Sequence, residues 1–165
     1  MDRSFCCVTL FAATLILAAS TVARAQSDPA AVLQRHVDAI ARGDAAGALA
    51  LYADDAIIDT HGPGSLCSAA PCVGKAAIQK ELERRVAAKQ AATILKTSVS
   101  GNLLVYWIES RNDTVRKAGV DRIVALGILE MKGDKIASAH VGIPDRTDPQ
   151  TARFDEWRRA QPPAR

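Results

Sequence analysis

Apolar residues recur at helical spacing in the first half of the chain and alternate with polar residues in the second half. Leu33, Val37 and Ile40 form one stripe after Asp28, and Pro29 suits a first helical turn. A second stripe runs through 75–89, where the charged residues off it are typical of a solvated face. The spacing therefore predicts one helix from about residue 28 and another over 75–89.

The pattern changes to a strand period after residue 90. The predicted strands share short turns and alternating or continuous apolar positions, and they are 93–99, 103–110, 120–130 and 135–143. Short turns between consecutive strands indicate an antiparallel meander. An earlier strand is predicted at 56–60. A last helix is predicted from Asp148 and Pro149, with Phe154 and Trp157 on one side.

The tripeptide Arg42-Gly43-Asp44 interrupts the first helical stripe. Gly43 fits a left-handed cap at the end of one helix, and Asp44 fits the N-cap of a second short helix that reaches residue 51. The tripeptide also resembles an integrin-binding motif. Because capping explains all three residues, we expect no integrin-binding role.

The first 25 residues have the three parts of a secretory signal peptide. These are Arg3, an apolar stretch over 5–20, and the small-residue site Ala23-Arg24-Ala25, after which we predict cleavage. A retained membrane anchor is the alternative, but the apolar stretch is shorter than the about 20 residues that a bilayer needs. Cys6 and Cys7 lie too early for a lipoprotein site. The sequence therefore predicts export to a periplasm or the exterior, without a stable membrane anchor.

Loss of that signal leaves Cys67 and Cys72 as the only cysteines of the mature chain. A cysteine pair in an oxidising compartment usually forms a disulfide, and this one would restrict the Gly- and Pro-rich loop over 61–72. A metal site at the cysteines would need two further ligands at matched spacing, which the three scattered histidines do not provide. We therefore predict a disulfide, no metal site and no cofactor.

Charge and length limit the classes of function and the number of domains that remain possible. The chain has 165 residues and a formal net charge of +3, and its acidic and basic residues are mixed throughout. Such a chain lacks the basic stripe of a nucleic-acid-binding protein. Its length suits one domain, and the predicted divisions are a signal peptide at 1–25, an α+β domain at 26–146 and a C-terminal helix with a frayed tail at 147–165.

Several short segments occur in an order that matches a known fold family. Gly43-Asp44 joins the first two helices, Leu51 to Ala56 (Leu-Tyr-Ala-Asp-Asp-Ala) leads into the first strand, Gly74-Lys75 opens the next helix, and Gly133-Asp134-Lys135-Ile136 turns into the last strand. Over about 28–143 the chain resembles the nuclear transport factor 2-like superfamily, specifically its SnoaL-like branch. The resemblance implies a cone-shaped α+β fold. Its N-terminal helices cover the concave side of a strongly curved antiparallel sheet and enclose a pocket that often holds a small apolar or amphipathic molecule.

The superfamily includes ketosteroid isomerases, polyketide cyclases, scytalone dehydratase and epoxide hydrolases, so the fold does not decide the function. The isomerase chemistry needs a carboxylate base on the first strand, with a tyrosine and a protonated aspartic acid as donors. The matching positions here hold Thr60, His36 and a residue near Leu126. We therefore expect no ketosteroid isomerase activity.

Strand alternation selects the candidate pocket residues. If the apolar positions of 120–130 face into the cone, Arg122 does too, and Trp107 and Glu109 share the inward face of the neighbouring strand. Glu109 and Arg122 would then pair, because either charge alone is costly to bury. With His36 and Tyr52 from the helical part, these three residues form the predicted ligand-binding set.

Each member of that set also has a purely structural explanation. His36, Tyr52 and Trp107 can be packing residues, and Glu109 with Arg122 can be a structural ion pair. Asp59, His61 and His140 are weaker candidates: the first two lie at the mouth end of the first strand, and His140 is expected to face away from the cone.

The sequence predicts an exported domain that binds a small apolar or amphipathic molecule in its central pocket. The alternative is a lyase, isomerase or hydrolase with Glu109 or His36 as general base and Arg122 stabilising negative charge. A third hypothesis is an interaction module that forms a homodimer through the outer sheet face.

Overall fold

The structure, a computed structural model, describes residues 28–62 and 64–161. The predicted signal peptide and its cleavage site lie outside the described residues. The elements in chain order are α1 (Pro29–Ala41), α2 (Ala45–Leu49), β1 (Tyr52–Thr60), β2 (Cys72–Val73), α3 (Lys75–Ala87), β3 (Ala91–Ser100), β4 (Leu103–Arg111), α4 (Asp113–Lys117), β5 (Ile123–Lys132), β6 (Lys135–Pro144) and α5 (Pro149–Arg159).

Local chemistry fixes the ends of the first two helices. The Asp28 side chain accepts a hydrogen bond from the backbone N–H of Ala30, at 3.0 Å, at the start of α1. Gly43, with φ of 80°, follows the last turn of α1, and Asp44 Oδ1 accepts from the N–H of Gly47 at 2.7 Å to cap α2. The capping prediction for this tripeptide is confirmed.

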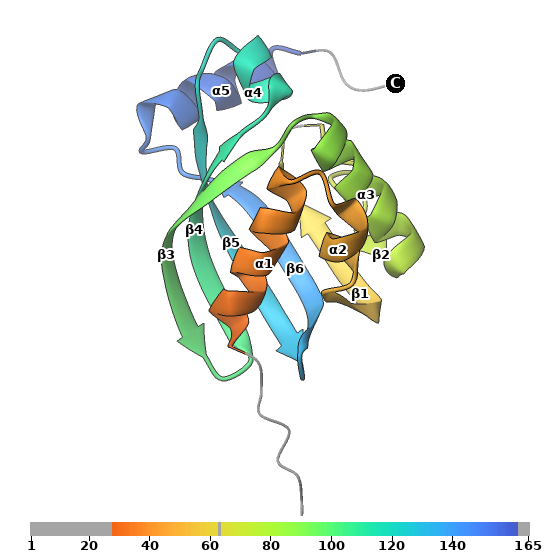
Figure 1. The fold of residues 1–165 in the computed structure, drawn as a ribbon. Coiled ribbons are helices and arrows are strands. Elements are labelled where there is room, and N and C mark those ends of the chain that lie inside the picture. Colours follow the sequence, from red (N-terminus) through yellow and green to blue (C-terminus); the bar gives the residue numbers. More distant parts are fainter. Residues whose placement is uncertain (1–27, 63, 162–165) are drawn as a thin grey trace, which may run out of the picture.

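Six strands form one sheet in the order β2-β1-β6-β5-β4-β3 (Figure 1). The four strands from β3 to β6 form the predicted antiparallel meander. Strand β1 pairs in parallel with β6. The parallel pair was not predicted, because it joins the first and last strands of the sequence and leaves no local pattern.

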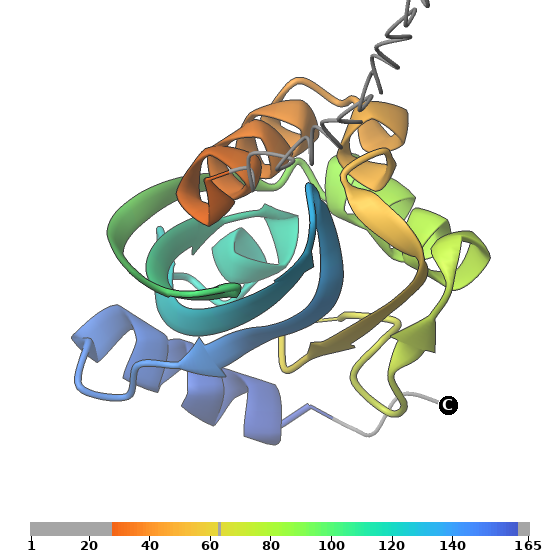
Figure 2. The ribbon, with the colours of Figure 1, turned by 90° about the horizontal axis from the view of Figure 1, so that it is seen from below.

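The sheet curls so that β3, β4 and β5 wrap around one side of α1, while α3 lies beside β1 (Figure 2). Register shifts occur in the β3–β4, β5–β6 and β1–β6 pairs, and such bulges bend and twist a strand. The largest core side chains lie between the helices and this concave face. They are Leu33, Ile58, Ile78, Leu82, Leu104 and Ile136.

A second, smaller core attaches α4 and α5 to the sheet. The charged segment 111–119 was expected to be a loop, but it contains α4, whose N-cap Asn112 accepts from the N–H of Val115 at 2.9 Å. This core contains Val115, Ile123 and Phe154, and Trp157 packs against it. In the part of the chain that the structure describes, no helix is long and apolar enough to cross a membrane.

Candidate functional site

A pocket lies on the concave side of the sheet, under α1 and α3, with a cavity volume of about 80 Å³. One water molecule needs about 10–15 Å³ of such space, so the pocket has room for a small organic molecule. Its apolar walls come from α1 and from the inward faces of β4, β5 and β6. They include Leu33, Val37, Ile40, Ile108, Ala125 and Val141.

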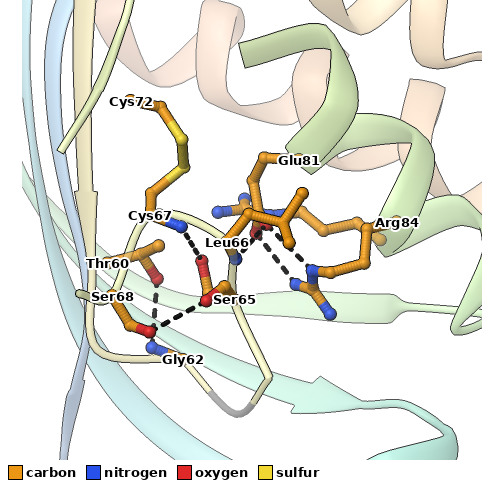
Figure 3. Close-up of polar contacts among 10 residues, drawn as sticks. Thr60, Gly62, Ser65, Leu66, Cys67, Ser68, Cys72, Glu81 and Arg84 are labelled. Carbon is orange, nitrogen blue, oxygen red and sulfur yellow. Dashed lines mark hydrogen bonds and ion pairs between the residues drawn. A yellow bond between two sulfur atoms is a disulfide. The ribbon is translucent and has the colours of Figure 1, made fainter. Parts of the chain in front are cut away.

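Three charged residues of α3 form the polar end of the pocket. Glu81 is fully buried, and its carboxylate accepts hydrogen bonds from Arg84 Nε and Nη2 and from Arg85 Nε, each at 2.8 Å. The backbone N–H of Leu66 donates to the same carboxylate at 3.0 Å (Figure 3). Positions three and four residues apart lie on one helix face, so α3 itself brings both arginines to Glu81.

These contacts keep the cluster charged. Burial alone would raise the pKa of Glu81, but the hydrogen bonds and charges of Arg84 and Arg85 outweigh it and lower this pKa to about 2. The pKa of Arg85 is raised because the charge of Glu81 overcomes the effect of burial. Two guanidinium groups against one carboxylate leave the polar end with a net charge of +1.

His36 adds a neutral polar group to the pocket. The residue is 8% exposed, and its Nδ1 has no hydrogen-bond partner among the described residues. Burial, together with the charge of Arg85, lowers the pKa of His36 to about 3. The imidazole is therefore neutral at physiological pH.

Two pocket residues were predicted from the helical part, but Tyr52 is the first residue of β1 and does not line the pocket. His36 lines the pocket. Tyr52 is 2% exposed in the core beside it, with the two rings edge to face and 5.6 Å between their centroids. Burial raises the pKa of Tyr52 to about 12, so its hydroxyl stays protonated.

The predicted inward face of β4 and β5 was wrong. Leu104, Tyr106 and Ser110 are the buried residues of β4, so Trp107 and Glu109 lie on the opposite, convex face. Register confirms this arrangement, because Glu109 pairs with a residue of β5, Val124, that also faces outward, next to α5. The alternation itself was correct. Both faces of β4 carry large apolar side chains, so apolarity could not select the inner one.

Glu109 and Arg122 do form the predicted ion pair, at 3.2 Å between Arg122 Nε and Glu109 Oε2, but outside the pocket. Arg122 Nη2 also contacts the carboxylate of Asp148, the N-cap of α5, at 2.9 Å. Glu109 pairs with Arg111 as well. These contacts attach α5 to the convex face, which matches the structural explanation of the pair.

The sequence analysis missed the charged residues of α3 by assigning all of them to a solvated face. A signal was present, because Ile78, Glu81, Leu82 and Arg85 follow the same three- and four-residue steps that mark a buried stripe. Two charges of opposite sign on the buried side of a helix indicate an internal ion pair. Counting charged residues on that stripe would have found the cluster.

The disulfide prediction is confirmed, since Cys67 and Cys72 are bonded. Their ring belongs to the loop that follows β1, and Leu66 of this loop donates to Glu81 (Figure 3). The backbone N–H of Thr60, a pocket residue, also bonds the carbonyl of Cys67 at 3.4 Å. The loop therefore supports the polar end of the pocket.

A helix-covered, curled sheet around an internal pocket is the architecture expected of the nuclear transport factor 2-like superfamily. A family model for the SnoaL-like domain matches residues 33–139, so the chain belongs to the SnoaL-like domain family. The sequence-based recognition of the family and of the α+β cone fold is thus confirmed. A search of curated proteins returned no match.

Solved structures with the same fold are distant in sequence. A putative polyketide cyclase from Sinorhizobium meliloti is 19% identical with a TM-score of 0.56, over 68% of this chain and 94% of that one. The epoxide hydrolase/cyclase-like enzyme SalBIII, described in pyran ring formation in the polyether salinomycin, is 17% identical with a TM-score of 0.58, over 72% and 92%. A computationally designed 17-OHP binder is 16% identical with a TM-score of 0.57, over 68% and 88%.

Proposed function

We propose that the pocket binds a small amphipathic molecule whose polar group is a hydrogen-bond acceptor or an anion. The observation that supports this proposal is a charged cluster, largely buried, at one end of a cavity whose walls are mostly apolar. Its net positive charge favours a carboxylate or a carbonyl over an amine. The apolar walls would hold the rest of the molecule, as is typical of ligand pockets.

The pKa values of the buried groups support binding more than proton transfer. A general base works best when its pKa is close to the working pH. With pKa values of about 3 and about 2, His36 and Glu81 are both weak bases at neutral pH. Glu109, the other candidate base, lies on the far side of the sheet from the pocket. A lyase, isomerase or hydrolase reaction is therefore the second candidate, with His36 as the remaining base.

Matched probes can test the charge preference. Phenylacetate, phenethyl alcohol and phenethylamine share a ring and differ in the polar group, so we expect the carboxylate to bind most tightly and the amine most weakly in isothermal titration calorimetry. Equal affinity for the three would contradict the proposed role of the arginines. Native mass spectrometry of protein purified from its own host would then identify the natural ligand.

Two neighbouring residues of β4 provide a variant and its control. Ile108→Trp would fill the cavity and abolish probe binding, because Ile108 lines the pocket. Trp107→Ala alters the opposite face of the same strand and would leave the affinity unchanged. The reverse result, loss with Trp107→Ala and retention with Ile108→Trp, would place the ligand on the convex face and refute the proposal.

We also propose that the protein is exported and that cleavage leaves Gln26 as the first residue. The N-terminal pattern supports export, and the Cys67–Cys72 disulfide is consistent with an oxidising compartment. Intact-mass measurement of protein from the cell envelope or medium should give a chain of 26–165. A cytoplasmic, uncleaved chain would contradict this proposal.

A homodimer through the convex face is a further proposal, supported by apolar side chains there. Leu103 and Val105 are 43% and 37% exposed, and Trp107 faces Leu126 on the neighbouring strand. Sedimentation equilibrium should detect a dimer that Val105→Lys weakens. A strictly monomeric protein at high concentration would exclude the dimer without affecting the pocket proposal.

A further inference from the structure

Three side chains that commonly bind metals meet on the convex face, where the end of β1 lies beside the middle of β6. Asp59 and His61 are two residues apart, and His140 is the register partner of Asp59 on β6. His140 Nδ1 and Asp59 Oδ2 are 2.9 Å apart, and the centroids of the two imidazole rings are 5.0 Å apart. One ligand atom from each residue lies within 4.8 Å of the other two.

The backbone holds this cluster together. The N–H of His61 donates to the carbonyl of Val141 at 2.8 Å, so the chain after β1 stays beside β6. Gly142 has a φ of 84°, and a Cβ there would lie 2.8 Å from the backbone nitrogen of Gly62. Only glycine allows so close an approach, and this approach places His61 next to His140.

The segment that carries His61 is also fixed from its other side. Thr60 Oγ1 accepts a hydrogen bond from the N–H of Gly62 at 3.0 Å (Figure 3). The backbone of Thr60 is bonded to Cys67, a member of the disulfide. His61 is therefore held at a strand end between β6 and a cross-linked loop, and its position is largely preorganised.

We propose that Asp59, His61 and His140 bind a divalent transition metal ion such as Zn²⁺. Two imidazoles and one carboxylate suit zinc and its neighbours in the first transition row, whereas Mg²⁺ and Ca²⁺ prefer oxygen ligands alone. Zinc bonds of about 2.0–2.2 Å place tetrahedral ligand atoms roughly 3.4 Å apart. The three ligand atoms already lie within 4.8 Å of one another, so binding an ion requires them to approach by little more than 1 Å.

The exposure of the cluster suits a site that is open to solvent. The side chains of His140 and Asp59 are 40% and 38% exposed, so an ion can enter and keep a water molecule as its fourth ligand. The site is separate from the pocket, because Thr60, between Asp59 and His61 in sequence, is 2% exposed and lines the pocket on the other face of β1. The proposal does not depend on the proposed ligand-binding function.

The sequence analysis predicted no metal site because the histidines are far apart in the chain. His61 and His140 become neighbours only through the parallel pairing of β1 with β6, which no local pattern predicts. Cys67 and Cys72 are bonded to each other and supply no ligand to this cluster.

Tag-free protein titrated with Zn²⁺ in a calorimeter tests the site directly. We expect one ion per chain with micromolar affinity, and Co²⁺ should give the visible absorption of a low-coordinate site with nitrogen and oxygen ligands. His61→Ala and His140→Ala should each weaken binding by more than about tenfold, since even the outer-shell partners of a metal site contribute about 10–100-fold. Asp59→Asn should weaken it as well.

Asp134→Asn is the matched control for Asp59→Asn, because Asp134 is an exposed residue of the turn between β5 and β6. It removes the same charge and should leave Zn²⁺ binding unchanged. The substituted residues are all exposed or half-buried, and circular dichroism checks that each variant is folded. An absence of saturable binding, or unchanged binding in the folded His61→Ala and His140→Ala variants, would overturn the proposal.

Discussion

Replacing His36 with leucine should remove much of the pH dependence of stability between pH 7.5 and 5.0. The folded protein lowers the pKa of His36 from 6.5 to about 3, because burial and the charge of Arg85 both disfavour the imidazolium form. An unfolded chain binds a proton at this side chain below pH 6.5, whereas the folded chain stays neutral until about pH 3. The contribution of the neutral His36 to the free energy of unfolding is therefore fully present above pH 6.5, and it declines as the pH falls toward 3.

The size of the effect follows from the two pKa values. At pH 5.0, protonation of the unfolded state alone should cost the folded state about 2 kcal/mol, and at pH 7.5 the cost is close to zero. Leucine cannot be protonated, so the stability of the variant lacks this pH-dependent cost. Glu81 does not interfere, because its low pKa affects stability only between its ordinary value of 4.5 and about 2.

Urea unfolding of both proteins at the two pH values gives the free energies of unfolding. The wild-type protein should lose about 2 kcal/mol more than His36→Leu when the pH falls from 7.5 to 5.0. All other titrating groups are common to the two proteins and cancel in this comparison. Equal pH dependence of the two would show that His36 titrates normally in the fold, and the description of the pocket as holding a neutral, unpartnered imidazole would be wrong.

Three further changes test the supports of the pocket. Glu81→Gln should lower the free energy of unfolding by about 3–5 kcal/mol, because it leaves two arginines without their buried carboxylate, whereas the exposed Glu83→Gln should change it little. Reduction of the loop disulfide should lower the urea midpoint by an amount equivalent to about 2 kcal/mol, the value expected for so short a ring, and an unchanged midpoint would contradict this role. Gly127→Ala should cost about 1–3 kcal/mol or displace Tyr106, because the new Cβ would lie 2.2 Å from that ring, and unchanged stability with an unchanged tyrosine NMR spectrum would contradict the packing.

Most of the elements could be predicted because their signals are local. Asp28 and Pro29 start α1, Asp148 and Pro149 start α5, and alternation locates each strand of the meander. Two short elements were not predicted, β2 and α4. Helix α4 has five residues, and its cap Asn112 lies within a charged segment that looks like a loop. A short helix of this kind depends on packing against the second core more than on its own sequence.

The candidate site was harder to predict, because it depends on which face of each element becomes the inside. The strand pattern paired Glu109 with Arg122 correctly, yet it could not tell the concave face from the convex one, since Leu104 and Tyr106 are as apolar as Val105 and Trp107. On α3, the burial of Glu81 and Arg85 was hidden by their charge. Their mutual neutralisation makes that burial possible, and it becomes visible only when the helix covers the sheet.

Local sequence was enough to predict most of the helices and strands, the caps of α2 and α5, the disulfide pair and the family. These features depend on residues that are close in the chain, or on a motif order that local chemistry preserves. Tertiary structure alone decided the curl of the sheet, the side of β4 that faces the pocket, and the parallel pairing that brings His61 to His140. Those features arise from contacts between segments that are distant in the chain. Such contacts stabilise the protein only once the whole sheet has closed around α1.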